Sequence, residues 1–461
     1  MTRLLPLAAA ALLLALPAQA QTFGSNVDVR DLNCSTNDSQ GDPNAQPNGH
    51  IRWPADDPVW EFDFSRPANS ITPRGTGLEL RDLYYDGVLV MKRANAPVLN
   101  VEYDAGGGCG CFRDWEDTER VFEADGAYAA PNSCFAEATP GTVRSTCEVA
   151  ATNNGGDVGT FTGVSVEDYG DELVISSHMS AGWYRYRMKW HLYLDGRIWP
   201  EYSFAAASAT CTEADHRHHT YWRFDFDMEG TPDNDIVREV NGPDDGRVFS
   251  VETDRTWGDP ADGVYWSVRD ADTGSGYDII PSEEDLLLPV DEFSQADALV
   301  LRYNPTEMDD NSNSCAIDYR SMVNDERLDG EDIVFWYRSS ALHVGGNPWE
   351  CDIVGPTLRP RGRFVSAEPD AAEAGVEIDA AYPNPFSPYT TVRFQVATTQ
   401  AVRLALYDAL GREVETLFQG EVVGGRSETV RIEGGALPTG TYTVRLIGET
   451  AEATQRIVLV R

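Results

Sequence analysis

Residues 216–230, HRHHTYWRFDFDMEG, alternate between two kinds of side chain. After two leading histidines the even positions are mostly aromatic or apolar, and the odd positions are mostly charged. Because side chains two apart share a face of a β-strand, the pattern predicts a strand with one interior face. His216 and His218 head that interior face, whereas His219 points to the opposite side. Two imidazoles so placed either bind one metal ion or are polar residues that need other hydrogen-bond partners.

Residues 182–196, GWYRYRMKWHLYLDG, show the same alternation. One face is apolar and opens with Tyr184, and the opposite face carries two arginines, a lysine and a histidine. The segment therefore predicts a strand that ends in a turn at Asp195-Gly196. Taken alone, a tyrosine at the position of Tyr184 is an ordinary core residue.

Short alternating runs separated by turns rich in Gly, Asp and Asn fill residues 57–360, which predicts a large β-domain. Residues 21–56 are polar and rich in turn-forming residues, which indicates an N-terminal arm rather than a domain. Every Trp, Met, Cys and His precedes residue 352, so the composition changes abruptly toward the C-terminus. Residues 361–375 indicate an acidic, Ala-rich linker, and residues 376–461 predict a small Ig-like antiparallel β-sandwich. The predicted fold class is all-β.

Residues 1–20 contain an early cation, an apolar run and a closing Ala-Gln-Ala, the layout of a cleaved secretory signal. No later segment is long and apolar enough for a transmembrane helix, so we expect an exported, soluble chain. Its eight cysteines are an even number, which favours disulfides, and no CxxC pair supports a zinc site. Cys109 and Cys111 are too close to bridge each other easily.

The formal net charge is −39, from 75 acidic and 36 basic side chains. A field of this sign repels nucleic acid and anionic lipid, so neither is an expected partner. The charge suits a salt-adapted acidic surface or one that attracts cations, and it gives no function by itself.

The C-terminal part carries AYPNPFSPYTTVRF, then LALYDALGREVETL, then LPTGTYTVRL, followed by a short closing strand. This order of motifs resembles the type A sorting domain of the type IX secretion system of Bacteroidota-like bacteria, over the whole of residues 376–461. The resemblance implies the type IX secretion machinery as a partner and a secreted or cell-surface location. It also implies that the sorting domain is cleaved or used for anchoring.

The large domain resembles the β-supersandwich catalytic domain of copper amine oxidases. The likeness begins at WEFDFSRPANSITPRGTGLELRDLYYDGVLVMKRANAPVLNVEYD and continues at SAGWYRYRMKWHLYLDGRI, the counterpart of the segment that carries the cofactor-forming tyrosine. It is strongest at HRHHTYWRFDFDMEG, where the family has His-x-His, then Arg-x-Asp and a nearby Gly. It returns at DIVFWYRSSALHVGGNPWE, where a Trp is followed seven residues later by His-Val.

The resemblance implies a set of site residues and an activity. His216, His218 and His343 match the three copper ligands, and three imidazoles with open positions suit Cu(II). Tyr184 matches the tyrosine that becomes topaquinone. In the family this quinone oxidises primary amines to aldehydes, and O₂ reoxidises it with release of ammonia and hydrogen peroxide. Family members are usually homodimers, so a homodimer is also an expectation.

The chain departs from the family around these residues. The family has Asn-Tyr-Asp/Glu-Tyr where this chain reads WYRY from residue 183, so Trp183 replaces Asn and Arg185 replaces an acid. The segment that carries the family's catalytic base has no match. Asp104 is the only acid at about the right spacing and is the candidate base. The small domains that precede the catalytic domain in the family are also absent.

These observations leave three hypotheses open. The chain is a secreted primary-amine oxidase dependent on copper(II) and topaquinone, or a copper-binding surface protein that has lost catalysis, or a metal-free structural β-sandwich. The family also binds Ca²⁺ at peripheral sites. The acidic runs PSEEDLLLPVDE and NPTEMDDNSNS are candidate oxygen donors for Ca²⁺, and solvated loops are the alternative.

Overall fold

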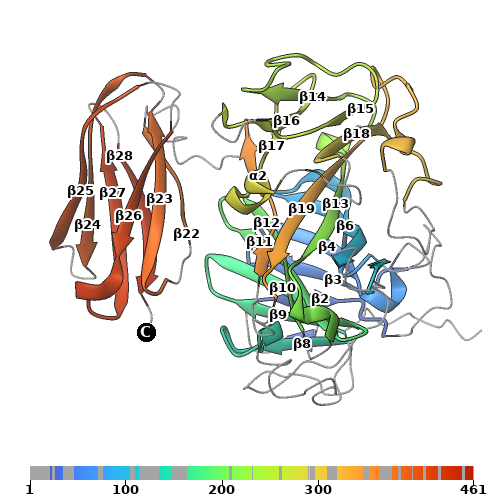
Figure 1. Ribbon diagram of the computed structural model, residues 1–461, viewed down its shortest axis with the longest axis horizontal. Helices are drawn as coiled ribbons and strands as arrows, with labels where there is room; N and C mark the ends of the chain where they lie inside the picture. Colours follow the sequence, from blue (N-terminus) through green and yellow to red (C-terminus); the bar gives the residue numbers. More distant parts are fainter. Residues whose placement is uncertain are drawn as a thin grey trace, which may run out of the picture. The chain divides into compact units, whose positions relative to one another are not determined.

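The computed structural model describes residues 21–22, 26–34, 46–70, 76–103, 109–113, 134–147, 163–206, 210–230, 232–258, 262–288, 290, 296–308, 319–345, 352–362, 376–382, 386–396, 398–408, 412–423, 427–448 and 452–459. The predicted signal segment, residues 1–20, lies outside them. The chain divides into two compact units, residues 1–364 and residues 365–461. In both, the described secondary structure is mostly strand with only short helical turns, so the all-β prediction is confirmed (Figure 1).

The first unit contains two large sheets. The strands of the first sheet, in spatial order, are β1 (Gln21–Thr22), β2 (Asp28–Arg30), β3 (Gly49–Trp53), β4 (Trp60–Ser65), β5 (Glu79–Tyr85), β6 (Val88–Tyr103), β13 (His216–Phe226), β19 (Ile333–His343), β18 (Ala298–Arg302) and β15 (Thr253–Arg255), with β7 (Cys111–Arg113) paired to β6. Strands β1 to β3 come from the segment expected to be a polar arm. They extend the edge of this sheet instead of lying apart from it.

The second sheet follows the order β14 (Asp235–Val240), β16 (Tyr265–Asp270), β17 (Gly276–Ile280), β21 (Thr357–Arg361), β12 (Ile198–Ala206), β11 (Tyr184–Tyr193), β10 (Glu172–Ala181), β9 (Val164–Asp168) and β8 (Phe135–Ala138), with β20 (Asp352–Val354) also paired to β12. The described helical elements of this unit are short: α2 (Glu283–Leu287) and the 3₁₀ turns η1 (Pro67–Asn69), η2 (Thr210–Glu213), η3 (Met228–Gly230) and η5 (Tyr319–Met322). The core of this unit is therefore formed mainly by side chains of the strands.

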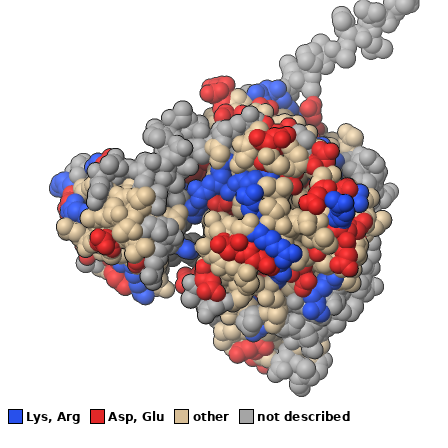
Figure 2. Space-filling model, turned by 90° about the horizontal axis from the view of Figure 1, so that it is seen from above, with Lys and Arg blue, Asp and Glu red and all other residues tan. Residues whose placement is uncertain are grey.

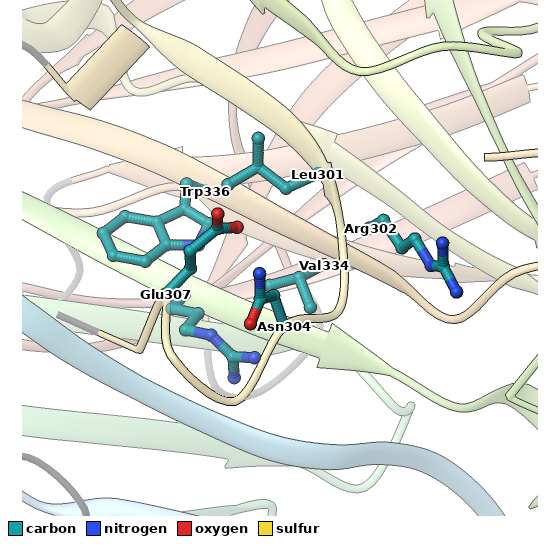
Figure 3. Close-up of a pocket in the computed structure, with 7 residues that line it drawn as sticks. Leu301, Arg302, Asn304, Glu307, Val334 and Trp336 are labelled. Atoms are coloured by element: carbon teal, nitrogen blue, oxygen red, sulfur yellow. The ribbon is translucent and has the colours of Figure 1, made fainter. Parts of the chain in front are cut away.

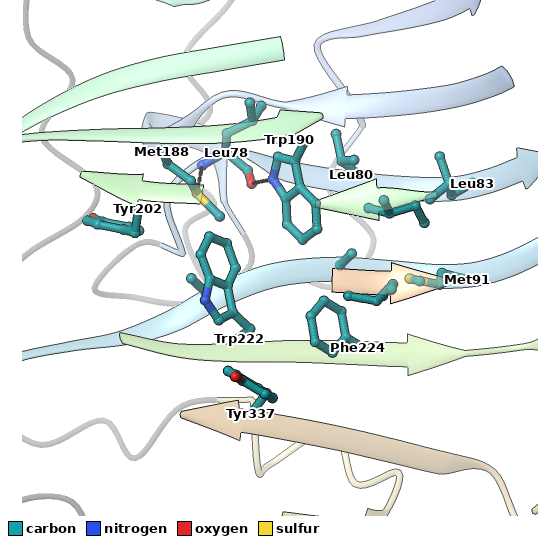
Figure 4. Packing of buried hydrophobic residues seen from close by; sticks show 14 of the residues in the cluster. Leu78, Leu80, Leu83, Met91, Met188, Trp190, Tyr202, Trp222, Phe224 and Tyr337 are labelled. Carbon is teal, nitrogen blue, oxygen red and sulfur yellow. Dashed lines mark hydrogen bonds between the residues drawn. The ribbon is translucent and has the colours of Figure 1, made fainter. Parts of the chain in front are cut away.

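The two sheets pack face to face through one large apolar cluster. Trp190 of β11 and Trp222 of β13 meet edge to face with their centroids 5.4 Å apart (Figure 4). The Trp190 indole also donates a hydrogen bond of 3.1 Å to the Leu78 carbonyl (Figure 4). The even positions of residues 216–226 thus face the second sheet, as their alternation predicts.

The odd positions of β13 are buried as well. A second cluster, which includes Tyr221, Leu301, Tyr319 and Trp336, covers the far side of this sheet. Arg223 lies there with 1% of its surface exposed, next to Asp225 at 3.2 Å. The charged face that the sequence indicates is therefore an interior layer of ion pairs and aromatic rings.

A shallow hollow on that same side has no room for a water molecule. It is lined by Arg223, Leu301, Arg302, Asn304, Glu307, Val334 and Trp336 (Figure 3). Because Arg223 and Trp336 point away from the second sheet, this hollow is separate from the histidines at the sheet interface.

The second unit has its own core and two sheets. One contains β22 (Val376–Tyr382), β23 (Tyr389–Val396) and β26 (Ser427–Glu433), and the other has the order β25 (Glu413–Val422), β24 (Gln400–Asp408), β27 (Gly440–Ile447) and β28 (Glu452–Leu459), with the 3₁₀ turn η6 (Gly434–Ala436) between β26 and β27. The pairings between these strands are all antiparallel, and one isolated parallel bridge joins Phe386 to Leu459. This is the small antiparallel sandwich that the alternation in the tail predicts.

Two disulfides have both of their cysteines among the described residues, Cys34 to Cys134 and Cys109 to Cys211, and Cys147 is disulfide-bonded as well. No cysteine among the described residues is free, which agrees with the prediction of disulfides. Cys315 and Cys351 lie outside the described residues. Across the described part of the chain, no helix is long and apolar enough to cross a membrane. On the face shown in Figure 2, acidic and basic side chains are interspersed despite the net charge of −39.

Candidate metal centre

The pairing of three neighbouring strands aligns the candidate ligands. In the register of β13 with its neighbours, His216 lies opposite both His343 of β19 and Tyr103 of β6. His218 lies two residues along β13 and therefore on the same face. Residues from three distant parts of the sequence thus meet at one end of the sheet, on the side that faces β11.

The three histidines form one compact cluster. One ligand nitrogen from each of His216, His218 and His343 lies within 4.8 Å of the other two. All three side chains are buried, with 3%, 3% and 0% of their surface exposed. No other group of three or more His, Cys, Asp or Glu side chains within the described ranges meets this spacing. The structure brings together the three residues that the sequence singled out.

Hydrogen bonds orient the imidazoles. The Nδ1 of His216 donates to the carbonyl of Ala214 at 2.7 Å, which leaves its Nε2 as the electron-pair donor. The Nε2 of His218 is buried and has no hydrogen-bond partner. A buried polar atom without a partner is costly, and a metal ion at this position would satisfy it. The residues present therefore fit a metal held by nitrogen donors.

Burial also sets the protonation state. It lowers the pKa of His216 to about 4, with the neighbouring His343 adding to the effect. It lowers the pKa of His218 well below its ordinary value. Both imidazoles are thus neutral near pH 7, as metal binding requires.

Tyr184 reaches the cluster from the second sheet. Its phenol hydrogen-bonds to Nε2 of His216 and lies 3.0 Å from Nδ1 of His343. Its ring meets that of His218 edge to face at 4.6 Å, and 1% of its surface is exposed. Tyr184 begins β11, and the parity of that strand turns it toward the sheet interface. The phenol oxygen is therefore adjacent to the nitrogens that would hold a metal.

Further aromatic residues line this site, and no sequence motif singles them out. Phe204 of β12 stacks on the ring of His218 at 3.7 Å. The ring of Tyr103 lies 4.6 Å from that of His216 in a tilted contact, and its hydroxyl accepts a 2.8 Å hydrogen bond from the indole of Trp183. The alternation of β6 and β12 marks these residues as interior. Only the strand register, which sequence periodicity does not supply, places them beside the histidines.

Trp183 and Arg185, the two sequence neighbours of Tyr184 that differ from the family pattern, do not join the histidine cluster. Arg185 donates to the carbonyls of Tyr184 at 2.9 Å and Gly182 at 3.4 Å, so its charge is held by the backbone at the strand entrance. Trp183 lies beside Tyr103 and is half-buried. Asp104, the candidate base, lies outside the described residues.

A second group of acidic side chains gathers at the other end of β13. Burial, followed by the charges of Asp225 and Asp227, raises the pKa of Asp332 to about 7. Burial and the charges of Asp270, Asp227 and Asp332 raise the pKa of Asp235 to about 8.

The acidic run at 281–292, a candidate for calcium binding, is not simply a solvated loop. Its Asp285 is fully buried and accepts a hydrogen bond of 2.7 Å from Tyr337. Within the run at 304–314, residues 309–314 lie outside the described residues.

Residues 380–460 match the family model of the secretion system C-terminal sorting domain, which confirms the prediction for the tail. No curated protein sequence matches the chain. Similar solved structures include a lysyl oxidase from Pichia pastoris, at 16% identity and a TM-score of 0.48, with 68% of this chain and 51% of that chain covered.

A copper-containing benzylamine oxidase from Hansenula polymorpha is similar at 14% identity and a TM-score of 0.48, covering 77% of this chain and 63% of that one. An Aspergillus nidulans amine oxidase is similar at 15% identity and a TM-score of 0.43, covering 68% and 51%. Copper amine oxidases, which the sequence motifs resemble, are thus among the solved structures similar to this chain. The chain spans about half the length of the Pichia enzyme.

Proposed function

We propose that the chain is an exported oxidase of primary amines that uses copper(II) and a topaquinone formed from Tyr184. The observation that carries the proposal is the position of the Tyr184 phenol, which contacts two of three clustered imidazoles inside the protein. Copper bound by His216, His218 and His343 would, with O₂, oxidise the tyrosine ring to the quinone that in turn oxidises an amine to an aldehyde.

The protein side chains supply the geometry. The register of β13 and β19 fixes two ligands opposite each other, and the hydrogen bond to Ala214 fixes the orientation of the His216 ring. Phe204 covers one face of His218, which keeps water from that ligand. Asp104 directly follows Tyr103 in the chain, and we propose it as the base that removes the substrate proton.

The second candidate function is copper binding without turnover. Two observations favour it: Tyr184 is almost fully buried, and its neighbours Trp183 and Arg185 differ from the residues that the resemblance implies. In this case the same three histidines would hold copper, but no amine would be oxidised. A metal-free structural sandwich is the remaining alternative, and the copper content separates it from both others.

The deciding experiment uses the mature chain from Gln21, loaded with copper under air. The proposal expects one copper ion per chain, a visible quinone absorption, a phenylhydrazine adduct at Tyr184 and peroxide release with primary amines. Copper at one per chain without quinone or peroxide would leave the second candidate. The absence of copper binding would reject both.

The remaining parts of the proposal concern export, calcium and assembly. We propose that residues 1–20 direct the chain to the Sec pathway before the tail engages type IX secretion. The acidic runs at 281–292 and 304–314 stay candidate oxygen donors for Ca²⁺. The homodimer stays a prediction that light scattering on the copper-loaded protein tests.

A further inference from the structure

An unbroken line of aromatic rings leads from the metal ligands toward the surface. The ring of Tyr103 packs against that of His216 with the centroids 4.6 Å apart and the planes tilted by 37°, and its hydroxyl accepts the 2.8 Å hydrogen bond from Trp183. Exposure increases along this line, because His216 and Tyr103 are buried at 3% and 4% while Trp183 is half-buried. We call these three residues the aromatic bridge.

Packing and a disulfide hold the aromatic bridge in place on both sides, near Trp183 and near His216. Phe112 packs edge to face against Trp183 and against Tyr103, each at 5.8 Å, and is itself 42% exposed. Cys109, in the segment just before Phe112, forms the disulfide with Cys211, five residues before His216 along the chain. The rings are therefore held in contact by strand pairing, by packing and by a covalent link.

We propose that Tyr103 and Trp183 form a protective path for oxidation, here called the outlet. Oxidising equivalents produced at the metal site pass through Tyr103 and oxidise Trp183, so they do not modify the ligand His216. The inference rests on the proposed function, because it needs copper at the histidines and hydrogen peroxide as the co-reactant. Indole and phenol are the aromatic side chains that lose electrons most readily, and they lie here between a metal ligand and solvent.

The net step balances without a further reactant. A C–H bond of the Trp183 indole and the O–O bond of hydrogen peroxide break, and a C–OH bond and one molecule of water form. The indole loses two electrons and the peroxide gains them. Hydrogen peroxide is the product that the proposed amine oxidation releases, so each turnover would expose the site to this reactant.

The experiment treats the copper-loaded full chain with hydrogen peroxide and locates added oxygen by tandem mass spectrometry. Trp199 is the internal control, since it is also half-buried and packs at a tilt against a histidine, His191, at 4.6 Å, away from the metal cluster. We expect Trp183 to gain oxygen ahead of Trp199, and only when copper is bound. Fragment ions separate oxygen on Trp183 from oxygen on Tyr184.

Three variants test whether oxidising equivalents pass from the metal site through Tyr103 to Trp183. Tyr103→Leu removes the ring between His216 and Trp183, so oxidation of Trp183 should fall to the level of Trp199. Trp183→Phe removes the acceptor, so oxidation of His216 should rise and copper should be lost faster during peroxide treatment. Tyr103→Phe keeps the ring against His216 and loses the hydrogen bond from Trp183, so it should lie between the wild type and Tyr103→Leu.

Equal oxidation of Trp183 and Trp199, oxidation without copper, or an unchanged pattern in Tyr103→Leu would overturn the inference. Copper content is measured on every sample. A chain that binds copper but shows no selective oxidation refutes the outlet alone, whereas a chain without copper refutes the proposed function and the outlet with it.

Discussion

The phenol oxygen of Tyr184 lies 3.0 Å from Nδ1 of His343, although the two residues are 159 positions apart in the chain. The contact joins the two sheets of the first unit, because Tyr184 begins β11 and His343 ends β19. A change at either residue should therefore alter the same chemistry, while changes on the outer faces of these strands should not.

Replacing His218 with alanine should abolish stoichiometric copper binding, because it removes one of three clustered nitrogen donors. His219→Ala is the matched control. His219 is equally buried but lies on the opposite face of β13, where its Nδ1 is 2.8 Å from the hydroxyl of Ser340. That control should bind copper normally and lose about 1–3 kcal/mol of stability. Copper content by elemental analysis checks both variants, and a His218→Ala chain with full copper would contradict the assignment.

Tyr184→Phe should keep copper but give no quinone absorption and no phenylhydrazine adduct, since the reacting phenol oxygen is gone. Tyr186→Phe provides the comparison. Its hydroxyl lies 3.4 Å from Nδ1 of His218, farther from the cluster than the Tyr184 phenol. We expect quinone formation to survive in that variant. Quinone in Tyr184→Phe would place the cofactor on another residue.

The sequence predicts the inward-facing site residues correctly, but not the burial of the charged faces on the same strands. Alternation along β11 and β13 correctly turns Tyr184, His216 and His218 inward, because one face of each strand is apolar. The same alternation suggests that the charged faces are solvated, and this is wrong. Arg187 is 6% exposed and pairs with Glu167 at 3.0 Å, so these charges form a buried second layer. Side-chain parity distinguishes two faces but does not show what covers each of them.

Strand register and disulfide pairing lie beyond what periodicity supplies. Tyr103 ends a long apolar strand, and nothing local distinguishes it from other core residues until β6 pairs with β13. An even number of cysteines predicts disulfides but leaves their partners open. The link from Cys109 to Cys211 follows from the way β7 folds back on β6 and η2 leads into β13.

The Cys109–Cys211 and Cys34–Cys134 disulfides form a natural pair for comparison, since they close loops of 102 and 100 residues. Replacing Cys109 and Cys211 with alanine should lower stability by about 4–5 kcal/mol, and so should replacing Cys34 and Cys134, because the loop lengths match. Only the first change should also weaken copper binding, because Cys211 lies just before His216. Thermal unfolding and copper titration test the two effects separately. Equal copper affinity in both variants would exclude a role of the Cys109 link in positioning the ligand.

Deleting residues 376–461 should stop the protein from reaching the cell surface or the medium, because the deletion removes the sorting domain. The first unit has its own core, so the truncated chain should still fold. Immunoblots of envelope and external fractions from the producing bacterium measure the effect, with the full-length His218→Ala chain as a control that should be exported. External truncated protein would show that export does not need the tail.

The raised pKa of Asp235 predicts in which direction the free energy of unfolding changes with pH. It is 2% exposed, and burial with nearby carboxylates raises its folded pKa to about 8, above the value of about 4 in an unfolded chain. The folded state therefore binds more protons between these two pH values, so the free energy of unfolding should fall as pH rises from about 4 to about 8. Asp235→Asn removes this ionisation and keeps an oxygen that accepts from the Met228 amide, bonded at 3.2 Å in the wild type.

The variant should match the wild type near pH 4 and exceed its stability at pH 9 by an amount on the order of 3 kcal/mol. Asp329→Asn, at an exposed position, should leave the slope unchanged. Denaturant unfolding in EDTA measures both variants, because a cation bound by the carboxylates would keep them ionised. A wild-type slope that persists in Asp235→Asn would show that another buried group controls the pH dependence.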